Sequence, residues 1–254
     1  MNDLFDLSGR VAAITGGSRG LGKEIAAALA EAGADVVIGA RTAGDLQAAA
    51  AELAEATGRR VLPAELDVTD RAACDAFIGR AIDEMGRLDI LVNSAGTNVR
   101  SFLADIRDED FHRIMQVNTT GTFYCCRAAA EPMVETGFGR IVNIGSALSK
   151  VGLSGRVSYC SSKGAVLQMT RTMALDLATT GVTVNCLCPG PFATEINRPV
   201  REDPEASAKL IGSIPMGRWG ELPEIRTAVL FLVSPASGYV TGSAVSVDGG
   251  WTAW

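Results

Sequence analysis

The sequence contains one histidine, His112, among 254 residues, and its six cysteines lack the spacing of a metal or redox motif. A Ser-His-Asp triad could therefore form only through His112, which we interpret as a surface or capping residue. Cys125 and Cys126 are adjacent, and one residue separates Cys186 from Cys188. We expect the cysteines to be small buried side chains in a reducing compartment, and we predict no metal site.

Basic residues are outnumbered, with 23 Lys and Arg against 29 Asp and Glu, for a net charge of −6. This balance argues against a nucleic-acid backbone or an anionic membrane as a partner. No apolar run has the length of a membrane span, and the first ten residues carry acids where a signal peptide would carry lysines. We therefore expect a cytoplasmic protein that binds neither nucleic acid nor membrane.

Short apolar segments alternate with longer helical segments along the whole chain, which is typical of a parallel sheet covered by helices on both faces. We predict a single α/β domain over residues 1–254. The predicted strands are Val11–Ile14, Val36–Gly39, Val61–Ala64, Ile90–Asn93, Ile141–Ile144, Val182–Leu187 and Ala244–Val247. The predicted helices begin near Leu21 and then cover Ala43–Ala56, Arg71–Met85 after an Asp70 cap, about Asp108–Val134, Tyr159–Ala178 and Leu222–Val233.

The segment Pro189–Gly220 is predicted to be long and irregular, because it is rich in proline, glycine and charge. Loops of this length in a compact α/β domain are usually functional. We predict a lid over a substrate site, in which Glu195 and Arg198 could add polar contacts.

A glycine-rich turn follows the first predicted strand, with the spacing Gly-x-x-x-Gly-x-Gly ahead of an alanine-rich helix. Glycine lets the backbone approach a pyrophosphate, and the helix N-terminus favours its charge. No Gly-Lys-Ser/Thr ending follows, which disfavours a P-loop. An ordinary strand-to-helix turn is the alternative. The turn predicts a dinucleotide site formed by Gly16, Ser18, Arg19, Gly20, Leu21 and Gly22.

The end of the second predicted strand discriminates between the two nicotinamide cofactors. A carboxylate there would bind the ribose hydroxyls of NAD, but the sequence reads Ile38-Gly39-Ala40-Arg41. Arg41 and Arg19 could hold a 2′-phosphate between them, unless both are simply solvated surface arginines. We predict NADP(H) as the cofactor, with NAD(H) as the weaker alternative.

Small and polar residues follow the third and fourth predicted strands, where the carboxyl ends of a doubly wound sheet meet a ligand. Asp67, followed by Val68, could accept a hydrogen bond from an adenine amine. Ala95 and Gly96, after Asn93, leave room for a ribose. We predict that these five residues contact the cofactor.

Tyr159 and Lys163 stand four residues apart, so a helix would place them on one face. An ammonium beside a phenol lowers the phenol pKa from about 10 and could make it an acid–base group near neutral pH. A solvated helix face is the alternative for the pair alone. Ser146 precedes Tyr159 by thirteen positions.

Taken together and in this order, these motifs resemble the short-chain dehydrogenase/reductase family over essentially the whole chain. The resemblance rests on Thr15–Gly22, Asn93–Gly96, Asn118, Ser146, Tyr159 with Lys163, Pro189-Gly190 and the closing Val247–Gly250. It implies a Rossmann-like, doubly wound parallel sheet of about seven strands with helices on both faces, usually assembled as a homotetramer.

The resemblance also implies roles for individual residues. Tyr159 would exchange a proton with the alcohol, while Lys163 lowers its pKa and holds the nicotinamide ribose. Ser146 would bond the substrate oxygen, and Asn118 would anchor a water chain to Lys163. Pro189, Gly190 and Thr194 would line the nicotinamide end, with Thr194 bonding the carboxamide.

The prediction of a substrate rests on Arg100 and on the branch of the family that the chain resembles. Arg100, a few residues beyond Gly96, could bind a substrate carboxylate beside Ser146 and Tyr159, or it could be a surface residue facing Asp105. The chain is most similar to the gluconate 5-dehydrogenase-like branch of sugar-acid dehydrogenases. A 3-oxoacyl-thioester reductase acting on acyl carrier protein or CoA substrates is the alternative enzyme. A vestigial dinucleotide-binding regulator is the alternative outside enzymes.

Overall fold

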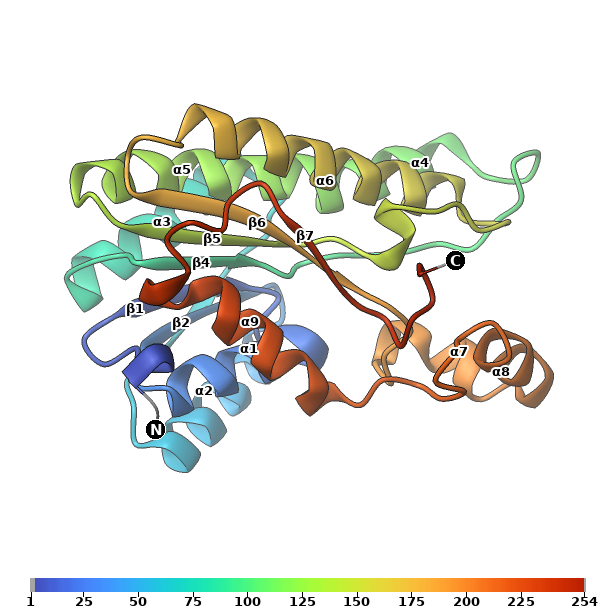
Figure 1. Ribbon diagram of the computed structural model, residues 1–254, viewed down its shortest axis with the longest axis horizontal. Coiled ribbons are helices and arrows are strands. Elements are labelled where there is room, and N and C mark those ends of the chain that lie inside the picture. The colour runs from blue at the N-terminus through green and yellow to red at the C-terminus, as the bar shows by residue number, and fades with distance from the viewer. Residues whose placement is uncertain (1–2, 254) are drawn as a thin grey trace.

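The computed structural model describes residues 3–253 and contains a seven-stranded sheet in which every pair of neighbouring strands is parallel (Figure 1). The order is β3-β2-β1-β4-β5-β6-β7. The prediction of a doubly wound parallel sheet is confirmed. The strands are β1 Val11–Thr15, β2 Asp35–Ala40, β3 Val61–Glu65, β4 Ile90–Asn93, β5 Gly139–Ile144, β6 Val182–Pro189 and β7 Ala244–Val247.

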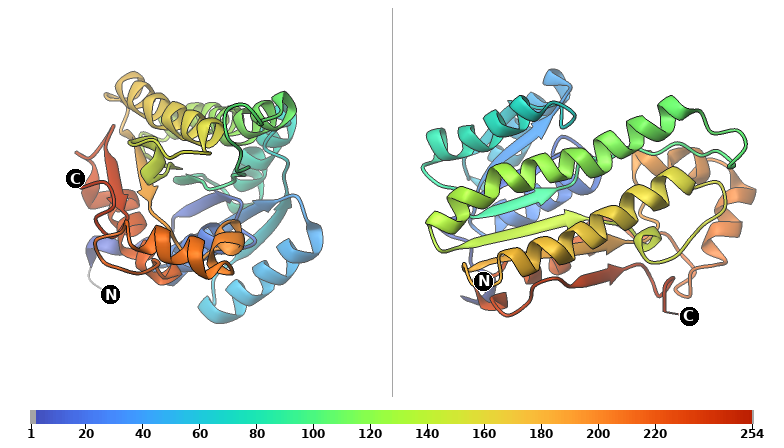
Figure 2. Two further views of the ribbon diagram at one scale, coloured as in Figure 1. Left: turned by 90° about the vertical axis from the view of Figure 1, so that its right-hand side faces the viewer. Right: turned by 90° about the horizontal axis from the view of Figure 1, so that it is seen from above.

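Helices cover both faces of this sheet. Figures 1 and 2 show α1, α2 and α9 on one face and α3, α5 and α6 on the other. Along β1 the side chains alternate between two apolar cores: Ala12 and Ile14 face one, while Val11 and Ala13 face the other. Both faces are buried, so the strands are apolar throughout. The helices are α1 Gly20–Glu31, α2 Ala43–Thr57, α3 Arg71–Met85, α4 Asp108–Met115, α5 Gly121–Glu135, α6 Val157–Asp176, α7 Arg198–Arg201, α8 Pro204–Ile211 and α9 Arg226–Val233.

The predicted helix boundaries agree within a few residues with those observed. The predicted cap of α3 is present, because the Asp70 carboxylate accepts hydrogen bonds from the backbone N–H groups of Ala72 and Ala73 at 2.8 and 3.4 Å. The predicted helix from Asp108 to Val134 is interrupted by a π-helical turn at Gln116–Thr120 between α4 and α5.

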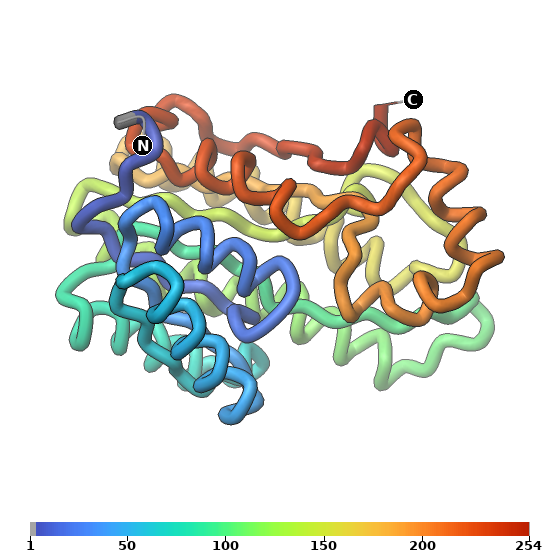
Figure 3. The backbone as a smooth tube through the Cα atoms, turned by 90° about the horizontal axis from the view of Figure 1, so that it is seen from below, coloured from blue at the N-terminus to red at the C-terminus, as the bar shows by residue number. Residues whose placement is uncertain are grey.

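The segment Pro189–Gly220 is not irregular throughout, so that prediction was wrong for α7 and α8. Asp203 caps α8 by accepting from the N–H groups of Glu205 and Ala206 at 3.0 and 3.1 Å. Pro204 then occupies the first helical position, where its missing N–H does no harm. Figure 3 shows this segment, in orange, beyond the carboxyl ends of the strands, at the same end of the molecule as the loop after β4.

The strand order reverses between β1 and β4, because the chain runs outward from β1 through β2 and β3 and then returns to the other side of β1. In open parallel sheets, ligands bind outside the carboxyl ends of the strands at such a switch point. The loops after β1, β2, β4, β5 and β6 therefore define the candidate site.

Candidate active site

A cleft of about 680 Å³ lies at this switch point. Ser146 and every predicted cofactor-binding residue except Asn93 line it. The structure thus brings together segments that are far apart in the sequence. These cofactor-binding residues are Gly16, Ser18, Arg19, Gly20, Leu21, Gly22, Arg41, Asp67, Val68, Ala95, Gly96, Tyr159, Lys163, Pro189, Gly190 and Thr194.

The glycine-rich turn is packed so closely that side chains are excluded at two positions. Gly16 has a φ of 69°, and a Cβ there would lie 2.9 Å from the backbone of Ala95. A Cβ on Gly22 would lie 2.2 Å from the carbonyl oxygen of Gly16. The turn therefore forms a backbone cradle at the N-terminus of α1, which fits the pyrophosphate of a dinucleotide.

Thr15 holds this turn against the loop after β4, a role that sequence reasoning missed. Its buried Oγ1 accepts hydrogen bonds from the N–H groups of Ser94 and Ala95 at 3.1 and 3.0 Å. A buried threonine at the last position of a strand, directly before the glycines, was the available signal. The two cofactor loops are thus joined by a side chain rather than by packing alone.

Asn93 is the one predicted cofactor residue that does not line the cleft, so its contact with the cofactor stays a prediction. Its Nδ2 donates to Asn143 Oδ1 at 2.9 Å, and Asn143 in turn donates to Thr170 Oγ1 at 3.0 Å. These bonds connect β4, β5 and α6 within the interior. The Asn93 Nδ2 group thus has a structural role, while its buried Oδ1 has no hydrogen-bond partner among the described residues.

The other lining residues that sequence reasoning missed flank the motifs already identified. Most lie within a few positions of a strand's carboxyl end, which was the signal that could have found them. They include Thr42, Asp45, Leu66, Thr69, Ser94, Thr97, Ile144, Gly145 and Asn197, whereas Glu195, which also lines the cleft, was named as a possible lid contact.

The end of the cleft beside β2 carries charges of both signs. Arg19 and Arg41 are exposed there, and neither forms an ion pair with any residue in the described range 3–253. Asp45, in the first turn of α2, lines the same end. A hydrogen bond from the Thr69 backbone lowers the pKa of Asp67, so this carboxylate is ionised at neutral pH.

Lys163 is buried among the carboxyl ends of the strands, with 5% of its surface exposed. Its Nζ donates a hydrogen bond to the carbonyl oxygen of Ile144 at 2.6 Å. Burial lowers the Lys163 pKa to about 8. The ammonium also stands close to Gly96, where an added Cβ would lie 3.8 Å from Nζ.

Tyr159 lies one helical turn before Lys163 on α6. Lys163 Nζ lies 6.0 Å from the centre of the Tyr159 ring and donates a hydrogen bond to the Ile144 carbonyl oxygen. Burial raises the pKa of Tyr159, while the Ser146 hydroxyl and the Arg156 guanidinium lower it. The lowering of this pKa by Lys163 stays a prediction, and Arg156 is a further cation that acts on the phenol and that sequence reasoning missed.

Ser146 begins a short 3-10 turn, Ala147–Ser149, directly after β5. Its Oγ accepts a hydrogen bond from Leu148 N–H at 3.1 Å, so its own hydroxyl proton is free to be donated to another oxygen. The serine and the Tyr159 phenol are thus two hydroxyl donors at the inner end of one cleft.

Asn118 lies in the π-helical turn and is fully buried. Its Oδ1 accepts from Thr97 N–H at 2.8 Å, while its Nδ2 donates to Thr97 O and to Ser162 Oγ, both at 3.0 Å. The side chain therefore fixes the loop after β4 to α6 beside Lys163. π-turns are often found at functional sites, and this one explains why poor helix formers stand within a long helix.

Arg100 lies outside the cleft lining and forms no ion pair with Asp105 or any other residue of the range 3–253. Arg198 is also absent from the lining, because it pairs with Glu195 at 3.2 Å and Glu202 at 3.8 Å. His112 is exposed on α4, as predicted.

Among residues 3–253, no three His, Cys, Asp or Glu side chains are grouped so that they could hold a metal ion. None of the helices in that range is long and apolar enough to pass through a membrane.

Comparison with known proteins agrees with this geometry. A family model described as Enoyl-(Acyl carrier protein) reductase matches residues 16–252. The chain is 42% identical to galactitol 2-dehydrogenase (L-tagatose-forming) of Cereibacter sphaeroides, over 99% of this chain and 98% of the relative. The chain belongs to the short-chain dehydrogenase/reductase family. It is an oxidoreductase of that family, which uses NAD(P)(H) as its cofactor.

Two further short-chain dehydrogenases illustrate the range of substrates. A gluconate 5-dehydrogenase from Burkholderia cenocepacia J2315, solved in complex with NADP and tartrate, superposes with a TM-score of 0.95 at 39% identity over 99% of this chain and 98% of that one. The 3-oxoacyl-[acyl-carrier-protein] reductase FabG of Vibrio harveyi is 36% identical over 97% of this chain and 98% of the relative. The similar proteins thus act on a polyol, a sugar acid and an acyl thioester.

Proposed function

We propose that this enzyme interconverts a secondary alcohol and a ketone with NADP(H), and that its substrate is a sugar acid or a related polyol or keto acid. The observation that carries the proposal is the meeting of Ser146, Tyr159 and Lys163 at the inner end of a dinucleotide-sized cleft. The backbone cradle of Gly16 and Gly22 fits the pyrophosphate of the cofactor.

The bound nicotinamide supplies or accepts the hydride, and the residues of the chain handle the proton and the oxygen. In the reducing direction, Tyr159 donates its phenolic proton to the carbonyl oxygen, and in oxidation it takes that proton back. Ser146 donates its free hydroxyl proton to the same oxygen and orients it. Burial raises the pKa of Tyr159, so the phenol is protonated and able to donate when a carbonyl substrate binds.

Lys163 and Asn118 hold the inner end of the cleft in shape. The Lys163 ammonium faces Gly96, where a ribose would lie, and can donate to its hydroxyls. Asn118 fixes the backbone of Thr97 on one side and Ser162 on the other. We assign Asn118 to positioning, through the loop that it holds beside Lys163.

The choice of NADP(H) rests on Arg19 and Arg41. Both are exposed at the cleft's β2 end without an ion-pair partner in the described range. Arginine binds phosphate through a planar fork, so the pair suits a 2′-phosphate. The Burkholderia relative was solved with NADP, which supports the same choice. The nearby Asp45 carboxylate would repel a 2′-phosphate. The ratio of kcat/KM for NADPH to that for NADH tests the choice.

The sugar-acid class rests on Arg100 and on the relatives. Arg100 has no carboxylate partner among the described residues, and the Burkholderia gluconate dehydrogenase was solved with tartrate, which is itself an acid. The experiment is a screen of NADPH oxidation with keto-sugar acids and with acetoacetyl thioesters, beside NADP-dependent oxidation of gluconate. Preferential turnover of the thioesters would contradict the sugar-acid class.

The second candidate is a 3-oxoacyl-thioester reductase, which the likeness to FabG of Vibrio harveyi favours. Docking of an acidic carrier protein would need a basic surface, and the net charge of −6 does not favour one. The thioester arm of the same screen tests this candidate directly.

We also propose a homotetramer working in the cytoplasm. Leu175 on α6 and Tyr239 before β7 are large apolar side chains that are 78% and 103% exposed, which supports burial against other copies. The six cysteines are all free, which suits a reducing compartment. Light scattering of the purified enzyme measures the assembly, and a monomer at micromolar concentration would contradict it.

A further inference from the structure

Arg156 lies next to the proposed proton donor, and part of its guanidinium has no partner. It is the N-cap residue of α6, three positions before Tyr159. Its Nη1 is buried and makes no hydrogen bond within residues 3–253. No carboxylate of that range pairs with it.

Arg100 is brought beside Arg156 by backbone pairing between two loops. Ser101 forms an isolated parallel bridge with Arg156, and the Ser101 N–H donates to Gly155 O at 3.2 Å. The bridge places the backbones of Arg100 and Arg156 in neighbouring loops, and burial together with the charge of Arg100 lowers the pKa of Arg156 to about 10. Burial also lowers the pKa of Arg100.

Two partly buried cations with no anion between them are unfavourable, because each has lost hydration without gaining a counter-charge. Arg140, elsewhere in the chain, is also buried but donates to four backbone carbonyls. Arg156 lacks such a set of acceptors. Asn98, in the same loop as Arg100, also has a buried Oδ1 without a partner. The region beside Tyr159 therefore contains polar groups that a ligand could satisfy.

We propose that Arg156 and Arg100 together bind the anionic group of the substrate beside Tyr159. A carboxylate can accept from both guanidinium groups, which relieves their repulsion and supplies Arg156 Nη1 with an acceptor. The inference rests on the proposed function and adds to it a residue that selects acids over neutral sugars.

The test compares an acid with its neutral counterpart in wild-type enzyme and in Arg156→Gln. The pairs are 5-ketogluconate with a neutral ketohexose for reduction, and gluconate with glucitol for oxidation. We expect Arg156→Gln to raise KM for the acids by about tenfold to a hundredfold, as the loss of a charged hydrogen bond predicts. KM for the neutral sugars should change by less than about twofold, and loss of the Arg156 charge near Tyr159 should change kcat by the same factor for acids and neutral sugars.

Calorimetry provides a measurement that does not depend on turnover. Titration of gluconate into the NADP-loaded wild type should show binding that is weakened about tenfold or more in Arg156→Gln, with Arg156→Lys intermediate because it keeps the charge without the fork. Arg127→Gln is the matched control, because Arg127 also has a buried, unpartnered nitrogen but lies on α5 rather than on α6 beside Tyr159. It should bind gluconate as the wild type does.

Other outcomes overturn the inference in distinguishable ways. Equal losses of kcat with acid and neutral substrates, with KM for the acids unchanged, would restrict Arg156 to its effect on Tyr159 and contradict a role in binding the anionic group. An unchanged affinity for gluconate in Arg156→Gln would remove it from substrate binding. If wild type turns over neither sugar acids nor neutral sugars, the proposed substrate class fails. Calorimetric titration of succinate into wild type and Arg156→Gln then tests the inference independently of the substrate class. Weaker binding of this dicarboxylate to Arg156→Gln supports a role of Arg156 in anion binding, and equal binding contradicts it.

Discussion

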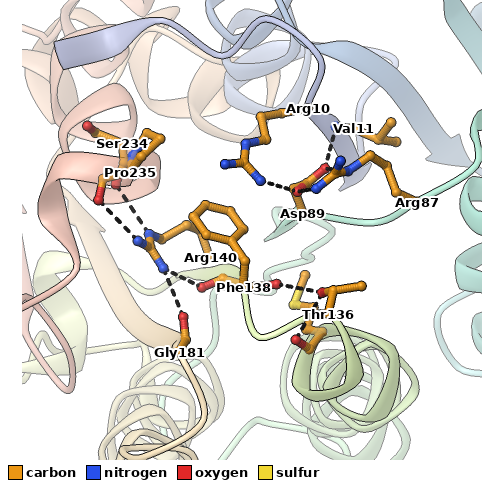
Figure 4. Close-up of polar contacts among 12 residues, drawn as sticks. Arg10, Val11, Arg87, Asp89, Thr136, Phe138, Arg140, Gly181, Ser234 and Pro235 are labelled. Carbon is orange, nitrogen blue, oxygen red and sulfur yellow. Dashed lines mark hydrogen bonds and ion pairs between the residues drawn. The ribbon is translucent and has the colours of Figure 1, made fainter. Parts of the chain in front are cut away.

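The two ends of the sheet differ in whether their charged side chains have partners within the chain. At the amino end, Asp89 is almost fully buried and accepts hydrogen bonds from Arg10 at 2.8 Å, from Arg87 twice at 2.7 Å and from Val11 N–H at 3.0 Å (Figure 4). The carboxylate has two cationic partners and a backbone donor. Its charge is compensated within the chain.

Arg140 completes this arrangement without any carboxylate of its own. Its guanidinium donates to the carbonyl oxygens of Gly139, Gly181, Ser234 and Pro235 at 2.9 to 3.3 Å (Figure 4). The ring of Phe138 lies 4.0 Å from the Arg10 guanidinium and 4.3 Å from that of Arg140. This favourable contact with both cations keeps them apart.

At the carboxyl end several cations lack such partners. Arg19, Arg41 and Arg100 are exposed and form no ion pair within residues 3–253, and the buried Arg156 Nη1 makes no hydrogen bond there. Natural proteins satisfy nearly all their buried polar groups, so the Arg156 Nη1 atom is informative. Asp89 and Arg140 are thus paired within the chain at the amino end, whereas cations at the carboxyl end are available, which supports the proposed binding of anions there.

The largest effect should come from removing the acid–base group at the carboxyl end. Tyr159→Phe should lower kcat by about a thousandfold, because general acid–base catalysis is lost. Binding of NADPH, followed by its fluorescence, should persist, since the substitution removes only one hydroxyl. Substantial residual turnover would exclude Tyr159 from the mechanism.

The amino end should respond to mutation in stability rather than in rate. Asp89→Asn leaves Arg10 and Arg87 without their counter-charge and should lower the free energy of unfolding by about 3 to 5 kcal/mol. Urea denaturation measures this loss. Asp83→Asn, an exposed acid on α3 with no ion pair in the described range, is the control and should change it by less than about 0.5 kcal/mol. A drop in kcat per folded Asp89→Asn enzyme would break the comparison between the two ends.

The buried Lys163 should make stability rise with alkaline pH. Its pKa is about 8 in the folded state against 10.5 for the free side chain. Between these values the unfolded chain binds more protons, so the free energy of unfolding increases with pH. At about 1.4 kcal/mol per pKa unit, the gain from pH 7 to pH 10.5 approaches 3 kcal/mol.

Urea denaturation across that range, in wild type and in Lys163→Met, isolates this contribution from other titrating groups. The wild type should gain stability relative to the variant as pH rises. A difference that stays flat would mean that Lys163 retains an ordinary pKa when folded.

A substitution at the end of the cleft beside β2, where the cofactor phosphate is proposed to bind, should have the smallest of these effects. Arg41→Ala should lower kcat/KM for NADPH by about tenfold to a hundredfold and leave the value for NADH within about twofold. The ratio of the two values measures the change. A wild-type enzyme that prefers NADH, or a variant that loses both activities equally, would refute the 2′-phosphate assignment.

Much of this protein could be predicted from local patterns. The seven strands were found because both sheet faces are buried, so each strand is a short continuous apolar run. Most of the predicted cofactor residues line the cleft, because glycine spacing and strand ends report backbone geometry directly. The i,i+4 spacing of Tyr159 and Lys163 likewise depends on the helix alone.

Contacts between distant segments were not predictable in the same way. Asn93 stands in a cofactor motif, yet its amide is used by Asn143, fifty positions later. Lys163 was expected to act on Tyr159, but its ammonium is bonded to the Ile144 carbonyl on β5. The pairing of Ser101 with Arg156, which brings the loop of Arg100 beside the start of α6, leaves no periodicity in either segment.

The sequence by itself determined the family, the parallel sheet and the residue proposed as proton donor, because repeated apolar spacing and fixed motifs encode local backbone conformation. Only the tertiary structure decided which charged side chains are paired within the chain and which are not. Compensation depends on distances between side chains that come from different strands and loops, and the order of residues along the chain does not specify those distances.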